Sequence, residues 1–158
     1  MKLNAIDAYS TFLYHQGTNH ESYRLLGAHF TVLRRKSCVR FAVWAPHAQA
    51  VSVVGDFNQW DAATHPMHRS EYGNGIWVAY IPGLTEGTIY KYAITTASGE
   101  VMLKSDPYAF ASEVRPHTAS KITKLRYAWK DKKWQESRSQ YDSYSQPMLT
   151  YEVGCMNR

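Results

Sequence analysis

The sequence predicts an all-β domain folded as an antiparallel β-sandwich. Short runs of residues alternate between apolar and polar side chains, and Gly, Pro, Asn and Asp separate the runs, as in strands joined by turns. Aromatic residues make up 14% of the chain, with Tyr 12 and Trp 5, and aromatic side chains favour strands. The 158 residues suffice for one domain with extensions, whereas a (β/α)₈ barrel needs ~250 residues.

A short helical segment is expected before the strands. In residues 4–16 the apolar side chains recur at helical spacing, at Ile6, Tyr9, Phe12 and Leu13. Gly17 can end this helix, and a second helical piece is expected over residues 21–26, closed by Gly27. We therefore predict a helical N-terminal extension over residues 1–28.

Strands are predicted from His29 onward, where the pattern changes to period two. Over residues 38–45, apolar positions alternate until Pro46, which ends the run because proline cannot donate to a sheet ladder. Tyr90 and Tyr92 share one face of a later run and are expected in the core. The other predicted strands are residues 51–54, 76–81 and 88–95, each followed by a turn signal, and a shorter run at 100–104.

The pattern weakens after Pro116. Residues 127–138 are expected to form an exposed turn and a short helix, with Asp131 as its N-cap. A linker rich in Ser, Gln and Tyr follows, and then a strand-like run at 148–153. With only four residues after Gly154, that last strand has little to pair with, so we expect the chain to be a truncated piece of a larger protein.

Composition and charge exclude several classes of protein. The net charge is +5, and the excess falls in residues 121–138, while the remainder has eleven basic and eleven acidic residues. A nucleic-acid partner is therefore not expected, because such proteins present a basic domain face. The sequence shows neither a secretory signal nor an apolar run of membrane-spanning length. Two cysteines far apart, Cys38 and Cys155, indicate free thiols in the cytoplasm.

The sequence lacks the motifs of a catalytic, metal or cofactor site. There is no nucleophile elbow, phosphate loop or dinucleotide fingerprint, and nothing singles out a pair of carboxylates. His65 and His68 have i,i+3 spacing, but no third metal ligand lies near them. No catalytic residue, metal or cofactor is expected.

The first candidate binding residue is Trp60, in the segment GDFNQWD (55–61). A sugar ring has apolar C–H faces and a rim of hydroxyls, so a site needs a flat aromatic ring with amides or carboxylates beside it. Trp60 could supply that ring, while Asn58, Gln59 and Asp61 could bond hydroxyls. The alternative is a turn at the edge of the sandwich whose tryptophan packs on the core.

Lys91 is the second candidate. Alternation places it opposite to Tyr90 and Tyr92, so it is expected on the outer face of its sheet. A lone exposed lysine is commonly just solvated, and that alternative stays open.

The chain resembles the N-terminal region of bacterial glycogen branching enzymes over roughly residues 12–153. The stretches that carry the resemblance include VRFAVWAPHAQAVSVVGDFNQWD (39–61), GTIYKYAI (87–94), KSDPYAF (104–110) and EVRPHTAS (113–120). The resemblance implies an immunoglobulin-like, glycogen-binding module at 29–123, a linker at 124–147 and the start of a truncated catalytic barrel at 148–158. In the family, the barrel forms α-1,6 branches by transferring cleaved α-1,4-glucan chains.

The resemblance also implies which residues bind glucan. In related modules, residues at the positions of Trp60 and Lys91 line the sugar site, so glycogen or amylose-type chains are the expected partner. Some such modules have a second tryptophan, but Glu100, Val101 and Met102 occupy that stretch here. We therefore expect weak binding, in the millimolar range or ~4 kcal/mol. The alternative is a stand-alone α-glucan-binding module without an enzymatic partner.

Overall fold

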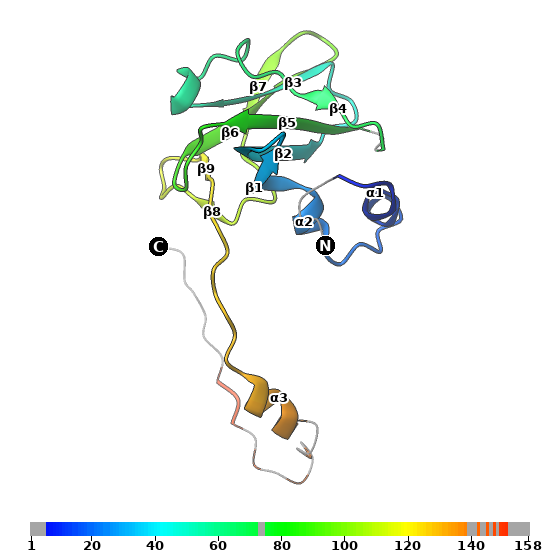
Figure 1. Ribbon diagram of the computed structural model, residues 1–158, viewed down its shortest axis with the longest axis vertical. Helices are drawn as coiled ribbons and strands as arrows, with labels where there is room; N and C mark the ends of the chain where they lie inside the picture. Colours follow the sequence, from blue (N-terminus) through cyan, green and yellow to red (C-terminus); the bar gives the residue numbers. More distant parts are fainter. Residues whose placement is uncertain are drawn as a thin grey trace. The chain divides into compact units, whose positions relative to one another are not determined.

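A computed structural model of the chain confirms the all-β, immunoglobulin-like sandwich (Figure 1). The structure describes residues 6–72, 75–138, 142, 145, 147 and 149–151. The chain divides into two compact units, Met1–Leu125 and Arg126–Arg158. The first unit holds both sheets and the N-terminal helices, so it contains every candidate residue named above.

Sheet A has the strand order β1-β2-β5-β4, and all its pairs are antiparallel. Its strands are β1 (Gly27–Leu33), β2 (Lys36–Trp44), β4 (His68–Arg69) and β5 (Ile76–Pro82). The period-two runs at 38–45 and 76–81 predicted β2 and β5. β1 begins before His29, the residue from which we expected strands.

Sheet B has the order β3-β6-β9-β8, with β7 also paired to β6. Its strands are β3 (Ala50–Gly55), β6 (Ile89–Thr95), β7 (Val101–Lys104), β8 (Ala111–Ser112) and β9 (Ser120–Lys121). β3, β6 and β7 were predicted. The sequence did not predict β4, β8 and β9, because a two-residue strand is too short to show a period.

The core lies between the two sheets. β2 and β5 contribute every second residue from sheet A, and β3 and β6 do so from sheet B. β-branched and aromatic side chains fill these positions, as expected for strands half-buried on one face. The buried residues of this cluster are Ala28, Val39, Phe41, Val43, Ala48, Val51, Val53, Met67, Trp77, Ala79, Ile81, Tyr90, Tyr92 and Ile122.

The N-terminal helices pack on the outer face of sheet A. They are α1 (Ala8–His15) and α2 (Ser22–Leu25), and Figure 1 shows α2 leading into β1, with α1 beside α2. The side chain of Asp7 caps α1 by accepting a hydrogen bond from the Ser10 amide at 2.8 Å. Leu25 and Leu26 form a second apolar cluster with Ala42 and Ile76 of the sheet. Partly buried Ile6, Tyr14, Val78 and Tyr108 pack against it. The helical extension was predicted, and this packing explains why it orders.

Arg40 is fully buried under these helices, at 0% exposure. Its guanidinium donates to the carbonyl of Leu25 at 2.6 Å and to that of Arg24 at 2.8 Å. Both carbonyls lie at the C-terminal end of α2, where helix carbonyls lack intrahelical partners. Arg40 therefore ties α2 to the sheet, and burial lowers the pKa of its guanidinium.

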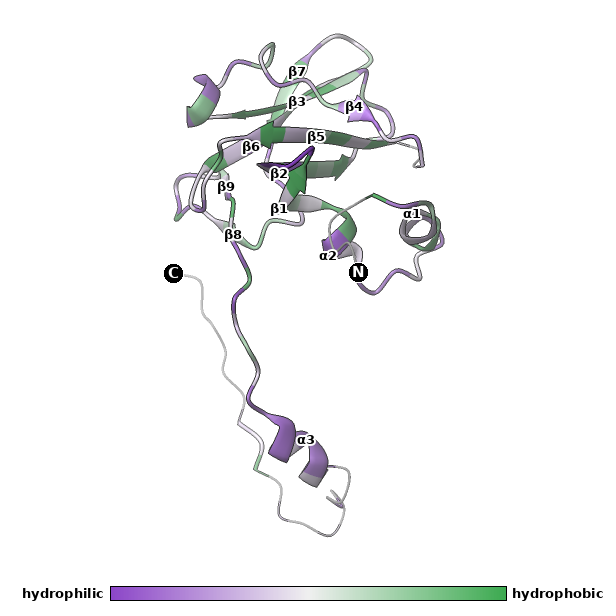
Figure 2. Cartoon of the chain, viewed as in Figure 1, coloured by the Kyte–Doolittle hydropathy of each residue, from purple (hydrophilic) through white to green (hydrophobic). Residues whose placement is uncertain are grey.

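The second unit contains α3 (Lys132–Arg138), close to the short helix predicted in 127–138. Asp131 directly precedes α3, and its carbonyl accepts from the Gln135 amide at 2.9 Å. Figure 2 shows α3 as hydrophilic, and none of its seven residues is buried. Of the strand predicted at 148–153, the structure describes 149–151, which are not in a strand, and the rest lies outside the described residues.

Candidate functional site

β3 ends at Gly55, and the chain then enters a short 3₁₀ helix, η1 (Asp56–Asn58). Gly55 lies opposite Tyr90 of β6. A Cβ atom on Gly55 would lie 2.2 Å from the carbonyl oxygen of Ile89, which no side chain tolerates. Only glycine therefore allows β3 and β6 to stay this close at the point where the chain leaves the sheet.

Asn58 holds the loop that follows. Its side-chain oxygen accepts from the Gly55 amide at 2.9 Å, and its side-chain nitrogen donates to the carbonyls of Val53 at 3.0 Å and Asp61 at 3.1 Å. The residue is 9% exposed. We expected Asn58 beside Trp60 as a group for sugar hydroxyls, but its amide is buried and bonded within the loop. A buried amide bonded on both sides fixes backbone geometry.

Trp60 follows in a left-handed backbone conformation, with φ at 62°, as does Gln59 with φ at 56°. Such φ values are uncommon for residues with side chains, and the surrounding hydrogen bonds impose them here. The Trp60 amide donates to the Gly55 carbonyl at 3.0 Å. The indole Nε1 donates to the Asp56 carboxylate at 2.8 Å. Trp60 is thus half-buried, and its ring is held in one orientation from one edge.

Asp61 is exposed at the end of the same loop. One carboxylate oxygen accepts from the Ala63 amide at 2.9 Å. A carboxylate has several acceptor positions, so the group can still bond a ligand hydroxyl.

Lys91 lies on β6, opposite Val54 of β3. Tyr90 and Tyr92 are both at 0% exposure and belong to the core, as predicted, so Lys91 lies on the outer face of sheet B. Its side chain is half-buried, and Nζ donates to the Thr118 hydroxyl at 2.7 Å. Thr118 comes from the loop between β8 and β9, so a hydrogen bond fixes the position of this ammonium group.

Strand order brings these groups to neighbouring positions. β3, β6 and β9 are adjacent in sheet B, and the loop of Trp60 follows β3 while Thr118 precedes β9. Gly55 at the end of β3 pairs with Tyr90 of β6, and Tyr90 pairs with Ser120 of β9. The end of β3, the start of β6 and the start of β9 therefore lie at the same end of the sheet. The same end of the sheet therefore carries an oriented indole, a carboxylate, an ammonium group and a hydroxyl. A hydroxyl-rich ligand with an apolar ring face needs these groups.

The family model of carbohydrate-binding module 48, described as the isoamylase N-terminal domain, matches residues 25–109. The chain belongs to this family. The matched residues include both Trp60 and Lys91 and run from the end of α2 to the segment after β7. The family assigns a carbohydrate-binding role to the module as a whole.

Branching enzymes are among the relatives of this module. The chain is 48% identical over 147 residues to the 1,4-alpha-glucan branching enzyme of Bacillus subtilis, a match covering 92% of this chain and 23% of the relative. It is 44% identical over 145 residues to that of Geobacillus stearothermophilus, covering 90% and 22%. These matches confirm the resemblance to branching enzymes. The chain spans about a fifth of the length of these relatives.

Solved structures with the same fold include pullulanases. The module superposes on the Klebsiella pneumoniae pullulanase complexed with maltotriose with a TM-score of 0.51 and 29% identity, covering 65% of this chain and 10% of that one. The pullulanase from Bacillus acidopullulyticus gives a TM-score of 0.50 and 29% identity, covering 63% and 12%. These enzymes share the sandwich with the module.

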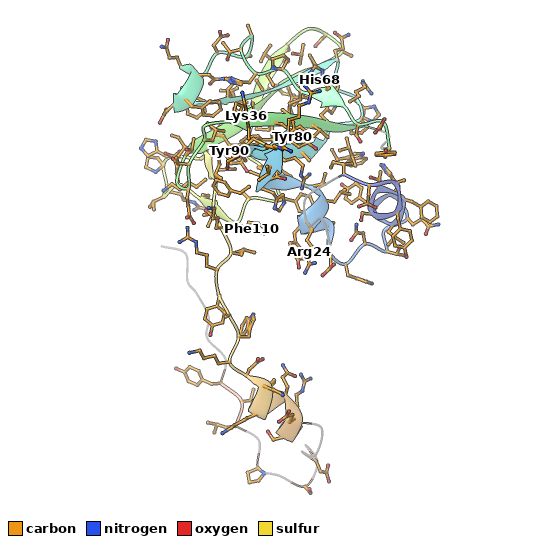
Figure 3. The ribbon with its side chains drawn as sticks, in the orientation of Figure 1. Arg24, Lys36, His68, Tyr80, Tyr90 and Phe110 are labelled. Atoms are coloured by element: carbon orange, nitrogen blue, oxygen red, sulfur yellow. The ribbon has the colours of Figure 1, made fainter. Side chains whose placement is uncertain are left out.

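The sequence did not point to a buried carboxylate that supports the site from inside. Asp106 accepts from the Tyr90 hydroxyl at 2.6 Å, the Tyr92 hydroxyl at 3.1 Å and the Tyr108 amide at 2.8 Å (Tyr90 is labelled in Figure 3). Burial raises the pKa of Asp106, and these hydrogen bonds oppose the rise without cancelling it. The signal that could have found Asp106 is its place beside Pro107 in KSDPYAF, one of the stretches that carry the resemblance to branching enzymes.

Thr118 was also missed, although it lies in the quoted segment EVRPHTAS. Sequence spacing alone cannot pair Lys91 with a residue of a distant loop. Among the described residues, no group of three or more His, Cys, Asp or Glu is placed to hold a metal ion. No helix in the described part of the chain is long and apolar enough to cross a membrane.

Proposed function

We propose that the module binds α-1,4-glucan chains, of the glycogen or amylose type, on the surface formed by Trp60, Asp61, Lys91 and Thr118. One observation carries this proposal: the loop of Trp60 and the side chain of Lys91 come from paired strands at the same end of sheet B. The indole covers the apolar face of a glucosyl ring, and Lys91 and Asp61 bond its hydroxyls. Asn58 acts as a positioning residue, because it fixes the loop that carries Trp60.

We further propose that the chain is the glucan-binding part of a 1,4-α-glucan branching enzyme of cytoplasmic glycogen synthesis. The relatives named above support this role, since the similarity extends over nine-tenths of the chain. The module itself is assigned no catalytic residue. Its task is to hold a glucan chain near the site where branches form.

Affinity electrophoresis in gels containing glycogen tests the binding proposal. Glycogen is expected to retard the wild type. Trp60→Ala is expected to remove most of the retardation, because the stacking of a sugar ring on the indole is lost. Lys91→Met keeps the length of the side chain but removes its ammonium group, and it should weaken binding less. Trp129→Ala is a matched control, because Trp129 is an indole 77% exposed in the second unit.

Two results would contradict the proposal. One is a wild-type mobility that glycogen leaves unchanged, and the other is equal retardation of wild type and Trp60→Ala. Near-ultraviolet circular dichroism checks that each variant keeps its packing. Incubation with amylose followed by iodine staining tests the second part, since the chain by itself is expected to leave the staining unchanged.

A further inference from the structure

A cavity of about 410 Å³ opens beside the proposed glucan surface. It lies between the segment that follows β7 and the loop that joins β8 to β9. Its volume is within the ~300–1,000 Å³ of pockets that bind small molecules. Its lining includes Ser105, Phe110, Glu113, Arg115, His117 and Thr118.

The walls of this cavity are held in place by hydrogen bonds. Pairing of β8 with β9 closes the hairpin, and the Glu113 carboxylate accepts from the Ala119 amide at 3.0 Å. The Ser105 hydroxyl donates to the carbonyl of Thr118, which joins the two walls. At the inner side, Asp106 lines the cavity and binds the core tyrosines. The cavity is therefore part of the fold and does not depend on a ligand to form it.

Charged groups of both signs line the cavity. Arg115 and His117 line the cavity and are exposed, and Glu113, two residues before Arg115, is half-buried. One fixed positive charge faces carboxylates of Glu113 and Asp106, so a phosphate or other anion would meet repulsion as well as attraction. Hydroxyls of Ser105 and Thr118 and the ring of Phe110 complete the lining (Phe110 is labelled in Figure 3). This mixture fits a neutral ligand rich in hydroxyls, such as a sugar.

Thr118 connects the cavity with the proposed glucan surface. It lines the cavity, and its hydroxyl accepts the hydrogen bond from Lys91. The loop of Trp60 follows β3, Lys91 lies on β6, and the cavity adjoins β9. Two interstrand spacings, roughly 10 Å, therefore separate the Trp60 side of this surface from the cavity. An oligosaccharide spans such a distance, whereas a single sugar ring does not.

We propose that this cavity is a second glucan subsite, which binds a glucosyl unit further along the chain that Trp60 and Lys91 hold. The inference rests on the proposed function and extends it, because it assigns Arg115 and His117 to binding. Binding at two places along one chain makes affinity depend on glucan length.

Isothermal titration calorimetry with maltotriose and maltoheptaose tests this subsite on the full chain. The double variant Arg115→Ala/His117→Ala removes polar groups from the rim without touching the bonds of Glu113 or Ser105. We expect it to weaken maltoheptaose binding roughly 3- to 10-fold and to leave maltotriose binding unchanged. The matched control is His20→Ala/Lys36→Ala, which removes one imidazole and one cation at exposed positions elsewhere.

The outcomes separate this inference from the proposed function. If the wild type binds neither sugar, both fail. If the wild type binds and Trp60→Ala abolishes binding, but the rim variant keeps full affinity for maltoheptaose, only the subsite is wrong. An equal loss for maltotriose and maltoheptaose would also overturn the subsite, because it would show that the rim variant disturbs the whole surface.

Discussion

The outer faces of the two sheets differ in what covers them, although both sheets share one core. On sheet A, the outward residues Cys38, Arg40 and Ala42 are between 0% and 5% exposed, because the N-terminal helices and nearby loops pack over this face. On sheet B, the outward residues Val101 and Leu103 of β7 are 55% and 50% exposed, whereas Ser52, Val54 and Ala93 of β3 and β6 are 8% exposed or less. The outer side of β2 is therefore covered, whereas that of β7 is exposed.

Strand alternation therefore indicates which way a side chain points but not whether it is exposed. Cys38 and Arg40 alternate with core residues in the same way as Lys91 does. Whether such a residue is buried depends on what a separate segment places over it. On β2, the helical extension covers Arg40 and Ala42.

The largest effect is expected from breaking the covered face at its buried cation. Arg40→Ala leaves the carbonyls of Arg24 and Leu25 without their donor and creates a cavity, so we expect a loss of about 3 kcal/mol or more in the free energy of unfolding. Urea unfolding measures it. Arg35→Ala, at an exposed turn, should change the same quantity by less than ~0.5 kcal/mol.

Arg40→Ala also tests which sheet carries the proposed glucan surface. Under conditions in which Arg40→Ala stays folded, its affinity for glycogen should equal that of the wild type, because the proposed site lies on sheet B. An unchanged free energy of unfolding would show that α2 does not depend on Arg40. A selective loss of glycogen affinity in the folded variant would place the binding surface on sheet A instead.

A smaller effect, on the pH dependence of stability, is expected at His29, which lies beside Arg40 on the covered face of sheet A. His29 Nε2 lies 2.8 Å from the Leu26 carbonyl, and burial lowers the pKa of this imidazole below its usual value of about 6.5. The hydrogen bond to Leu26 opposes this shift, whereas Arg40, paired opposite on β2, adds to it. The folded protein therefore favours neutral His29, with Nε2 as the donor to the carbonyl.

The sign of the pH effect follows from this lowered pKa. Below pH 6.5 the unfolded chain binds a proton at His29 that the folded chain does not. The contribution of His29 to the free energy of unfolding is therefore complete above pH 6.5 and is lost as pH falls. His29→Gln keeps a donor for Leu26 but does not titrate. We expect the difference in unfolding free energy between the wild type and His29→Gln to shrink as pH falls from about 7.5 to about 5.5. Urea unfolding at intervals of roughly half a pH unit measures it. A constant difference between the two unfolding free energies would contradict it.

The sequence predicted most of the fold because the main strands are long enough to show a period. The strands over 38–45, 76–81 and 88–95 carry the pattern, and proline or glycine ends each run. The two-residue strands and the burial of Arg40 could not be predicted, because both depend on contacts between segments distant in sequence. Local patterns contain no information about such contacts.

The candidate site was predictable in part. Trp60 and Lys91 were identified by residue type and by resemblance, and their assignment to glucan remains a prediction. Asn58 and Asp61 were both expected to bond sugar hydroxyls from the same short segment. The structure places them differently, because the Asn58 amide is buried within the loop whereas the Asp61 carboxylate is exposed. Thr118 escaped notice because it reaches Lys91 from another loop.

The smallest expected effect concerns the orientation of Trp60. Asp56 accepts the indole N–H at 2.8 Å and is itself exposed, so Asp56→Ala should change the free energy of unfolding by less than ~0.5 kcal/mol. The ring would lose its hydrogen bond and sample more orientations before binding. A ligand must then restore one orientation, which we expect to weaken glycogen affinity roughly two- to three-fold.

Asp56→Asn provides the matched control, because its side-chain oxygen can still accept from the indole. Affinity electrophoresis should place Asp56→Asn near the wild type and Asp56→Ala between the wild type and Trp60→Ala. If both Asp56 variants bind as the wild type does, the indole needs no preset orientation. If both bind as weakly as Trp60→Ala, the Asp56 carboxylate itself contacts the glucan, and the binding surface then extends to the start of η1.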